Sequence, residues 1–89
     1  MPTVRFTRNI QRHVECPTCE IPGRTLREVL DGYFRANEAP RGYVLDDQGR
    51  LRHHMAAFVD GGLISDRERL SDPVSERAVI DVIQALSGG

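Results

Sequence analysis

The chain has 89 residues and a formal net charge of −1, from 12 basic and 13 acidic side chains. This length allows one domain, and a hydrophobic content of 39% is ordinary for a globular protein. The near-neutral charge argues against a nucleic-acid partner, because phosphate recognition needs a concentrated basic surface. The longest apolar run, residues 55–59, is far short of the roughly 20 residues that a bilayer requires, and no signal peptide is visible, so we expect a cytoplasmic protein without membrane association.

The first part of the chain predicts two strands. Val4, Phe6 and Ile10 share period-two spacing, which is typical of a half-buried strand. A second apolar and β-branched stretch, residues 14–21, predicts another strand. Pro17 lies inside it and forces a bulge or an edge position, because proline cannot donate to a ladder.

A helix with a clear beginning follows. Thr25 is a suitable N-cap and Glu28 stands three residues later, which is the pattern of a capping box. Gly32 weakens the interior by about 1 kcal/mol relative to alanine, and Asn37 and Pro40 end the helix. The apolar stripe expected to face the core consists of Leu26, Val29, Leu30, Tyr33 and Phe34.

The second half of the chain predicts mainly extended structure. Residues 46–49 form a turn between short extended pieces at 43–45 and 50–52. A strand over residues 55–59 ends at the Asp60-Gly61-Gly62 turn, Leu63 and Ile64 restart it, and a last strand covers residues 79–86. This order of elements indicates an α+β fold. We expect one domain over residues 1–86 and a flexible tail over 87–89.

The chain stops at Gly88-Gly89, directly after the last predicted strand. Glycine has no Cβ, so such a tail can enter a narrow enzyme channel and its backbone can approach a nucleotide closely. The unhindered carboxylate of Gly89 can then attack an ATP phosphate and become an acyl adenylate. The alternative is a frayed end without a function.

Three stretches together resemble the ubiquitin-like sulfur carriers of the ThiS and MoaD type. They are the capped helix start TLREVL at residues 25–30, the hairpin FVDGGLI at residues 58–64 and the end VIQALSGG at residues 82–89. Arg52-His53-His54, before the third long strand, is also similar to some bacterial members. The resemblance implies the β-grasp fold, a mixed sheet of four to five strands packed on one main helix.

The resemblance also implies a chemical cycle at Gly89. An E1-like enzyme of the ThiF or MoeB type would adenylate its carboxylate with ATP, and a sulfur donor would replace AMP to leave a thiocarboxylate. The sulfur would pass to an accepting enzyme in the biosynthesis of a cofactor, an amino acid or a secondary metabolite. The chain would be a co-substrate and not an enzyme, with no bound cofactor.

Two other functions stay open. The chain could be a protein modifier that is joined through Gly89 to lysines of target proteins, or an interaction module with an inert tail. All 12 basic residues are arginine, which suits both the carrier and the modifier because it limits self-acylation.

Docking on an activating enzyme needs an apolar surface. If Met55, Ala57 and Val59 face the core, period-two counting places Phe58 on the opposite face of the sheet. If Ile80 and Val82 face the core, the same counting places Ile83 on that opposite face. Ubiquitin and its relatives carry an apolar recognition surface on the matching strands, so Phe58 and Ile83 are the docking candidates. The alternative is that single exposed apolar residues need no partner. Ala85 and Leu86 complete the predicted partner-binding set; ubiquitin has arginine at the position of Ala85, which argues against ubiquitin's own enzymes.

Cys16 and Cys19 form a Cys-x-x-Cys motif, which can be redox-active or supply half of a zinc site. His13 and one of the neighbouring His53 and His54 could complete a zinc site only if the fold brings them together. In an unbroken strand, residues three apart point to opposite faces, so we interpret the pair mainly as strand residues. A metal site and a disulfide switch remain as alternatives.

Overall fold

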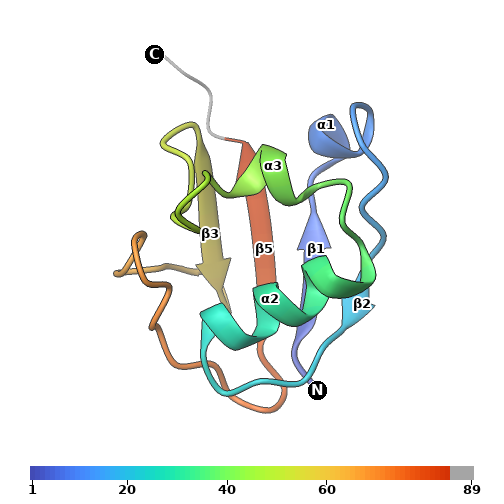
Figure 1. The fold of residues 1–89 in the computed structure, drawn as a ribbon. Helices are drawn as coiled ribbons and strands as arrows, with labels where there is room; N and C mark the ends of the chain where they lie inside the picture. The colour runs from blue at the N-terminus through green and yellow to red at the C-terminus, as the bar shows by residue number, and fades with distance from the viewer. Residues whose placement is uncertain (85–89) are drawn as a thin grey trace.

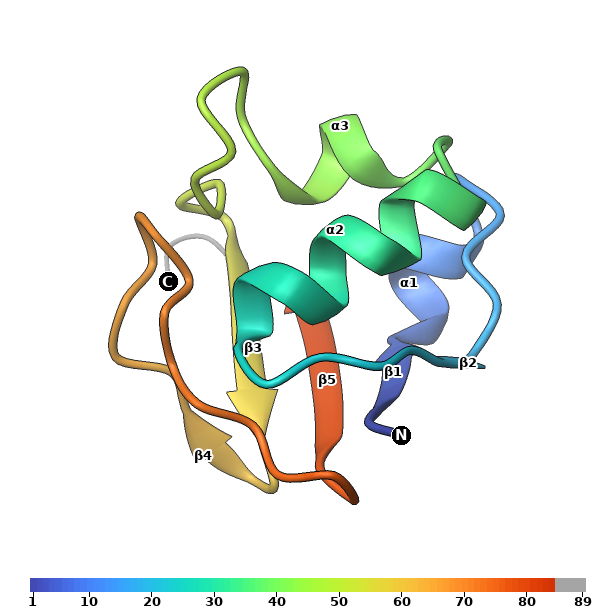
Figure 2. The same cartoon turned by 60° about the horizontal axis from the view of Figure 1, so that its bottom comes forward.

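Residues 1–84, the part of the chain that the computed structural model describes, form a sheet with a long helix across one of its faces (Figures 1 and 2). The elements are β1 (Thr3–Phe6), α1 (Arg8–Gln11), β2 (Cys19–Glu20), α2 (Leu26–Ala36), α3 (Arg41–Val44), β3 (Met55–Val59), β4 (Gly62–Leu63) and β5 (Val79–Gln84). This confirms the predicted α+β class, with five strands in the sheet.

The last strand occupies the middle of the sheet, whose order is β2-β1-β5-β3-β4. β5 runs parallel to β1, with Val4 opposite Ile80, and antiparallel to β3, with Ala57 opposite Val82 (Figure 1). The short strands β2 and β4 form the two edges. A parallel central pair with antiparallel neighbours makes this a mixed sheet.

The core lies between the sheet and α2. Val4, Ala57, Ile80 and Val82 are fully buried on the sheet, as their alternation along the strands predicts. On α2 the buried residues are those of the predicted stripe, Leu26, Val29, Leu30, Tyr33 and Phe34. Within residues 1–84 every fully buried side chain of the core is hydrophobic, so burial of apolar area stabilises the contact between the two layers.

The predicted capping of α2 is confirmed. The Thr25 side chain accepts a hydrogen bond from the backbone N–H of Glu28, with 3.2 Å between Oγ1 and N. The Glu28 carboxylate in turn accepts from the backbone N–H of Arg24, one residue before the cap. Asn37 ends the helix as predicted, with its N–H donating to the Tyr33 carbonyl.

The predicted strand over residues 14–21 is wrong except at its end. Within residues 14–21 only β2 is a strand, which pairs with β1, and the segment before it is a loop in which Pro17 has no N–H to donate. Ile10 does not belong to the first strand either: it lies in α1 and is buried there. Its spacing of four residues from Phe6 fits a helical turn as well as a strand, which explains the wrong assignment.

Two further boundaries differ from the prediction. Residues 41–44 form the short helix α3, where an extended piece was expected at 43–45. Pro40 is the N-cap of this helix. The turn at 46–49 is confirmed, with Gly49 at positive φ. A turn also follows Val59, with Gly61 at positive φ, but it is one residue shorter than predicted, because β4 consists of Gly62 and Leu63 rather than of Leu63 and Ile64. β5 ends at Gln84, so the last two residues of the predicted strand 79–86 lie outside the described residues.

Within residues 1–84 no helix has the length and apolar character that crossing a bilayer requires.

Candidate functional site

The predicted chemical centre is carried by the segment that follows β5. Gly88 and Gly89, and with them Ala85 and Leu86, lie outside the described residues. The structure does describe where this segment starts: Gln84 is opposite Met55, the first residue of β3, and its side-chain oxygen accepts a hydrogen bond from Asn9. β5 therefore ends beside the beginning of β3 (Figure 1).

The face of the sheet opposite α2, here called the outer sheet face, carries the predicted docking residues. Phe58 on β3 is opposite Asp81 on β5, and Ala56 is opposite Ile83. Because directly paired residues share a face and Ala57 and Val82 are buried, Phe58 and Ile83 point away from the core as predicted. Both side chains are half-buried rather than fully exposed.

Leu63 is a member of the outer sheet face that the sequence interpretation missed. It lies on β4 directly opposite Phe58 and is 63% exposed, more than any other large hydrophobic residue of the described chain. The turn consists of Asp60 and Gly61 alone, one residue shorter than predicted, and this register places Leu63 beside Phe58 in the hairpin. Leu63, Phe58 and Ile83 together provide the apolar part of this face.

A salt bridge borders the apolar residues. Arg5 on β1 lies opposite Asp81, and its Nε and Nη2 atoms donate to the two carboxylate oxygens at 2.8 and 3.0 Å. These hydrogen bonds, together with the carboxylate charge, raise the pKa of Arg5. The row across the outer sheet face therefore runs from leucine and phenylalanine on β4 and β3 to a paired aspartate and arginine on β5 and β1.

The two cysteines are in different surroundings, and Cys16 is in the loop before β2 rather than in a strand. Cys16 is buried, its thiol donates to the Val14 carbonyl, and burial raises its pKa, which disfavours a reactive thiolate. Cys19 is half-buried and accepts from the Asn37 side chain. Burial, with smaller contributions from both cysteines, also raises the pKa of Tyr33, whose hydroxyl donates to the Pro17 carbonyl.

The histidines do not join the cysteines. His13 stacks on Tyr43, with 6.2 Å between the ring centroids. His53 and His54 lie in the turn before β3, edge to face with each other at 5.8 Å. Among residues 1–84 no group of three or more histidine, cysteine, aspartate or glutamate side chains is placed to hold a metal ion.

The whole fold matches several solved structures. A chain of the Amycolatopsis orientalis BexX/CysO complex matches with a TM-score of 0.82 and 17% identity, covering 100% of both chains. Small archaeal modifier protein 1 from Haloferax volcanii matches with a TM-score of 0.77 and 18% identity, over 99% of this chain and 98% of that chain. Mycobacterium tuberculosis CysO, described as an antigen, matches with a TM-score of 0.80 and 15% identity, over 97% of this chain and 100% of that chain.

No protein-family model and no curated protein sequence matches the chain. At identities of 15 to 18% the structural likeness concerns the fold. The fold that the ThiS and MoaD resemblance implied is thereby confirmed. The chain has the ubiquitin-like β-grasp fold that it shares with CysO and the small archaeal modifier proteins.

Proposed function

We propose that the protein is a sulfur carrier whose C-terminal Gly89 is activated as an acyl adenylate and converted to a thiocarboxylate. The observation that carries this proposal is a β-grasp fold with Gly88 and Gly89 at the fourth and fifth positions after its central strand, an arrangement that resembles the ThiS and MoaD type. Glycines at the end of a rigid body suit a reaction in which an enzyme must enclose the backbone.

The chemistry is supplied by partners. A carboxylate oxygen of Gly89 attacks the α-phosphorus of ATP, and pyrophosphate leaves. Hydrosulfide then attacks the acyl carbon and AMP leaves, which gives the thiocarboxylate. If the donor is a persulfide, its attack on the acyl carbon gives an acyl disulfide, and a thiol must then reduce this disulfide to release the thiocarboxylate. The thiocarboxylate then donates its sulfur to an accepting enzyme in the biosynthesis of a cofactor, an amino acid or a secondary metabolite.

An E1-like enzyme of the ThiF or MoeB type is the proposed partner, and the outer sheet face is its proposed contact surface. Leu63, Phe58 and Ile83 supply apolar area, and the Arg5–Asp81 pair borders it. Apolar residues surrounded by polar groups are the usual composition of a contact surface. The proposed need for ATP and a reduced sulfur donor fits a reaction in the cytoplasm.

The test is the intact mass of the protein purified from a host that carries the neighbouring genes of its own genome. The carrier is expected to show a mass increase of one sulfur-for-oxygen exchange and retarded migration in a gel that contains an organomercury reagent. A variant that lacks Gly89 should show neither change and should keep the melting temperature of the parent, because the missing residue follows the sheet. Sulfur transfer by this variant would overturn the proposal.

A second candidate is a protein modifier, which the likeness to small archaeal modifier proteins favours. A modifier would appear in higher-mass adducts, joined through Gly89 to lysines of its targets. Trypsin cleaves after Arg77, so the remnant on each target lysine would run from Ala78 to Gly89. Abundant lysines carrying this remnant, in cells whose free protein has no thiocarboxylate, would establish the modifier in place of the carrier.

A further inference from the structure

A cleft of about 420 Å³ opens beside the beginning of β3, between residues 50–54 and the loop at residues 67–68. We call it the arginine cleft. Its cationic and imidazole lining consists of Arg50, Arg52, Arg67, His53 and His54. Two carboxylates, Asp46 and Glu68, also line it.

Two of these arginines are held by backbone carbonyls and not by carboxylates. Nη2 of Arg67 donates to the carbonyls of Arg52 and Met55, both at 2.7 Å, and Nε of Arg52 donates to the carbonyl of Gly42 at 2.7 Å. Both side chains are half-buried, and within residues 1–84 neither is in a salt bridge. A guanidinium has five N–H donors, so each keeps several donors and an uncompensated charge.

The carboxylates of the arginine cleft do not cancel these charges. Asp46 is occupied: it accepts from the backbone N–H of Arg50 and of Gln48, and its second oxygen pairs with the Arg50 side chain at 3.0 Å. The backbone hydrogen bond from Arg50 is the main cause that lowers the pKa of Asp46. Glu68 is exposed and, in the described chain, outside any salt bridge. The lining therefore holds two positive charges without an ion-pair partner, on Arg52 and Arg67, and one such negative charge, on Glu68.

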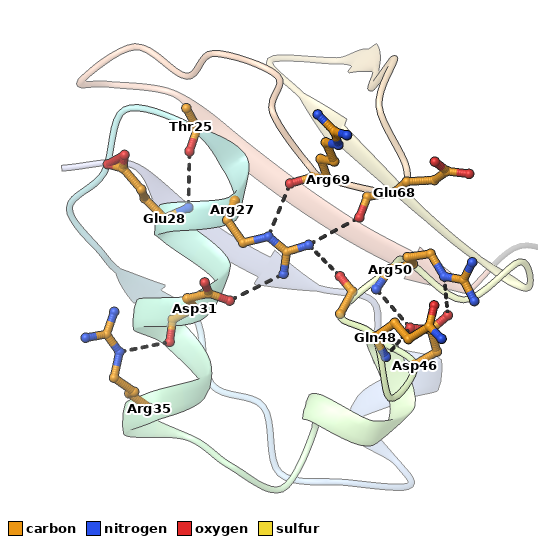
Figure 3. A network of polar contacts seen from close by, with 11 residues as sticks. Thr25, Arg27, Glu28, Asp31, Arg35, Asp46, Gln48, Arg50, Glu68 and Arg69 are labelled. Atoms are coloured by element: carbon orange, nitrogen blue, oxygen red, sulfur yellow. Dashed lines mark hydrogen bonds and ion pairs between the residues drawn. The ribbon is translucent and has the colours of Figure 1, made fainter.

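Arg27 of α2, which is not part of the cleft lining, connects the two walls of the arginine cleft by hydrogen bonds. Its Nη2 donates to the carbonyl of Gly49 at 2.6 Å and to that of Glu68 at 3.3 Å, and its Nε donates to the carbonyl of Arg69 (Figure 3). One side chain thus joins the turn on one side of the cleft to the loop on the other. A site held in this way loses little conformational entropy when a ligand binds.

We propose that the arginine cleft binds a phosphate-class oxyanion, either free diphosphate or the phosphate chain of a nucleotide. Arg52 uses only Nε in its backbone contact, so its Nη1–Nη2 fork can match two phosphate oxygens, and Arg67 keeps Nε and Nη1 as further donors. The cleft has room for more than one phosphate group. His54 directly precedes Met55, whose partner in the sheet is Gln84, so the anion lies near the base of the C-terminal segment. This inference goes beyond the proposed function and does not depend on it.

The experiment is a titration of the ¹⁵N-labelled full chain with sodium pyrophosphate at low ionic strength, followed by amide chemical shifts. We expect saturable shifts at residues 50–54 and 67–68, with binding that weakens as salt is added. Parallel titrations with ATP and AMP distinguish the source: tighter binding of ATP than of pyrophosphate identifies a nucleotide, and the reverse identifies the free anion. Binding of succinate as tight as that of pyrophosphate would overturn the assignment to phosphate.

Matched variants locate the site. Arg52→Gln is expected to weaken pyrophosphate binding roughly tenfold, the effect of losing a charged hydrogen-bond donor. Arg77→Gln makes the same charge change on an exposed residue before β5, outside the arginine cleft, and should leave the affinity unchanged. Equal weakening by both variants would show nonspecific attraction and overturn the proposal.

Glu68→Gln gives a test that does not depend on Arg52, whose contact with Gly42 also supports the loop. Only the backbone carbonyl of Glu68 takes part in the contact with Arg27, so this variant should keep the fold. Removing the carboxylate from the arginine cleft is expected to strengthen pyrophosphate binding several-fold, because a repulsive charge is lost. An unchanged or weaker affinity would contradict the proposed position of the anion.

Discussion

Arg27 connects three segments that are far apart in the sequence. Its guanidinium reaches the carbonyls of Gly49, Glu68 and Arg69 and lies 3.5 Å from the Asp31 carboxylate, while its side chain is only 28% exposed (Figure 3). The contact with the Gly49 carbonyl is partly buried, and a hydrogen bond from a charged group in such surroundings contributes more than an exposed ion pair does. This residue therefore holds the loops on both sides of the arginine cleft.

We predict that Arg27→Met lowers the free energy of unfolding by about 2 kcal/mol, because the carbonyls of Gly49 and Glu68 lose a charged donor. Urea unfolding monitored by circular dichroism measures the change. Arg35→Met is the matched control on the same helix, since Arg35 is exposed and makes a single 3.4 Å contact with a backbone carbonyl of its own helix. Similar losses in the two variants would contradict the role assigned to Arg27.

Asp66 organises the loop between β4 and β5 through its carboxylate. The Ser71 hydroxyl donates to it, as do the backbone N–H groups of Arg69, Ser71 and Glu68. These hydrogen bonds, that of the Ser71 side chain first, lower the pKa of Asp66 to about 2. The carboxylate is thus favoured in the folded protein over the unfolded chain.

The sign of the pH effect follows from this lowered pKa. The contribution of Asp66 to stability is fully present above its unfolded value of 3.8 and is lost as pH falls through about 2. We therefore predict that the melting temperature of the parent falls between pH 4 and pH 2 more steeply than that of Asp66→Asn. Parallel melting curves across this range would show that the carboxylate has no such role.

At the scale of elements, α2 was predictable because its signals are local. The cap, the apolar stripe and the ending at Asn37 all lie within residues 25–37, and the structure confirms each. β3 and the hairpin after it were predictable for the same reason, since alternation and a glycine turn are short-range patterns.

The segments around α2 were not predictable in this way. β2 is defined by pairing of Cys19 and Glu20 with β1, a contact between distant residues that no local pattern encodes. α1 and α3 are single turns, which propensity and periodicity cannot separate from loops. For the candidate site, counting along strands gave the correct face for Phe58 and Ile83, but Leu63 emerged only from the register of the hairpin.

Gly32 shows how contact between elements overrides propensity within one. By helix propensity, Gly32→Ala should stabilise α2 by about 1 kcal/mol. A Cβ at this position would lie 2.8 Å from the Cγ2 methyl of Ile21, a β-branched side chain that cannot easily move away. We predict that Gly32→Ala is destabilising, because overpacking typically costs about 1–3 kcal/mol.

Chemical denaturation measures the change in the free energy of unfolding caused by Gly32→Ala, alone and combined with Ile21→Ala. The double variant removes the methyl group that the new Cβ would meet, so the substitution at position 32 should become favourable in that background. A stabilising Gly32→Ala in the parent protein would mean that the contact with Ile21 relaxes without cost.

At the scale of the whole molecule, the outer sheet face is the surface on which the activating partner is proposed to dock. Leu63→Asp is expected to weaken binding of the activating enzyme by more than about 1 kcal/mol, because a carboxylate would be desolvated in an apolar contact. Phe58→Asp should have the same effect, although its half-buried side chain makes its fold more sensitive. Binding measured by calorimetry, with melting curves for each variant, separates the two effects.

Tyr43→Asp serves as the control for these variants. Tyr43 is another exposed apolar residue, 43% accessible, but it lies on α3 rather than on the sheet. Its replacement should leave binding to the activating enzyme unchanged. If Leu63→Asp binds as well as the parent does, the partner uses a different surface.

The position of β5 at the centre of the sheet governs when this protein can fold during its synthesis. β1 and β3 leave the ribosome before residues 79–84, yet each has β5 as its principal neighbour in the sheet. The nascent chain therefore cannot complete its sheet until β5 is translated, and the long-range pairing of β1 with β5 slows folding relative to a chain with local contacts. Asp81 and Ile83 also belong to the outer sheet face. A chain whose translation stops before β5 consequently lacks both the complete sheet and part of the outer sheet face, the surface proposed for docking.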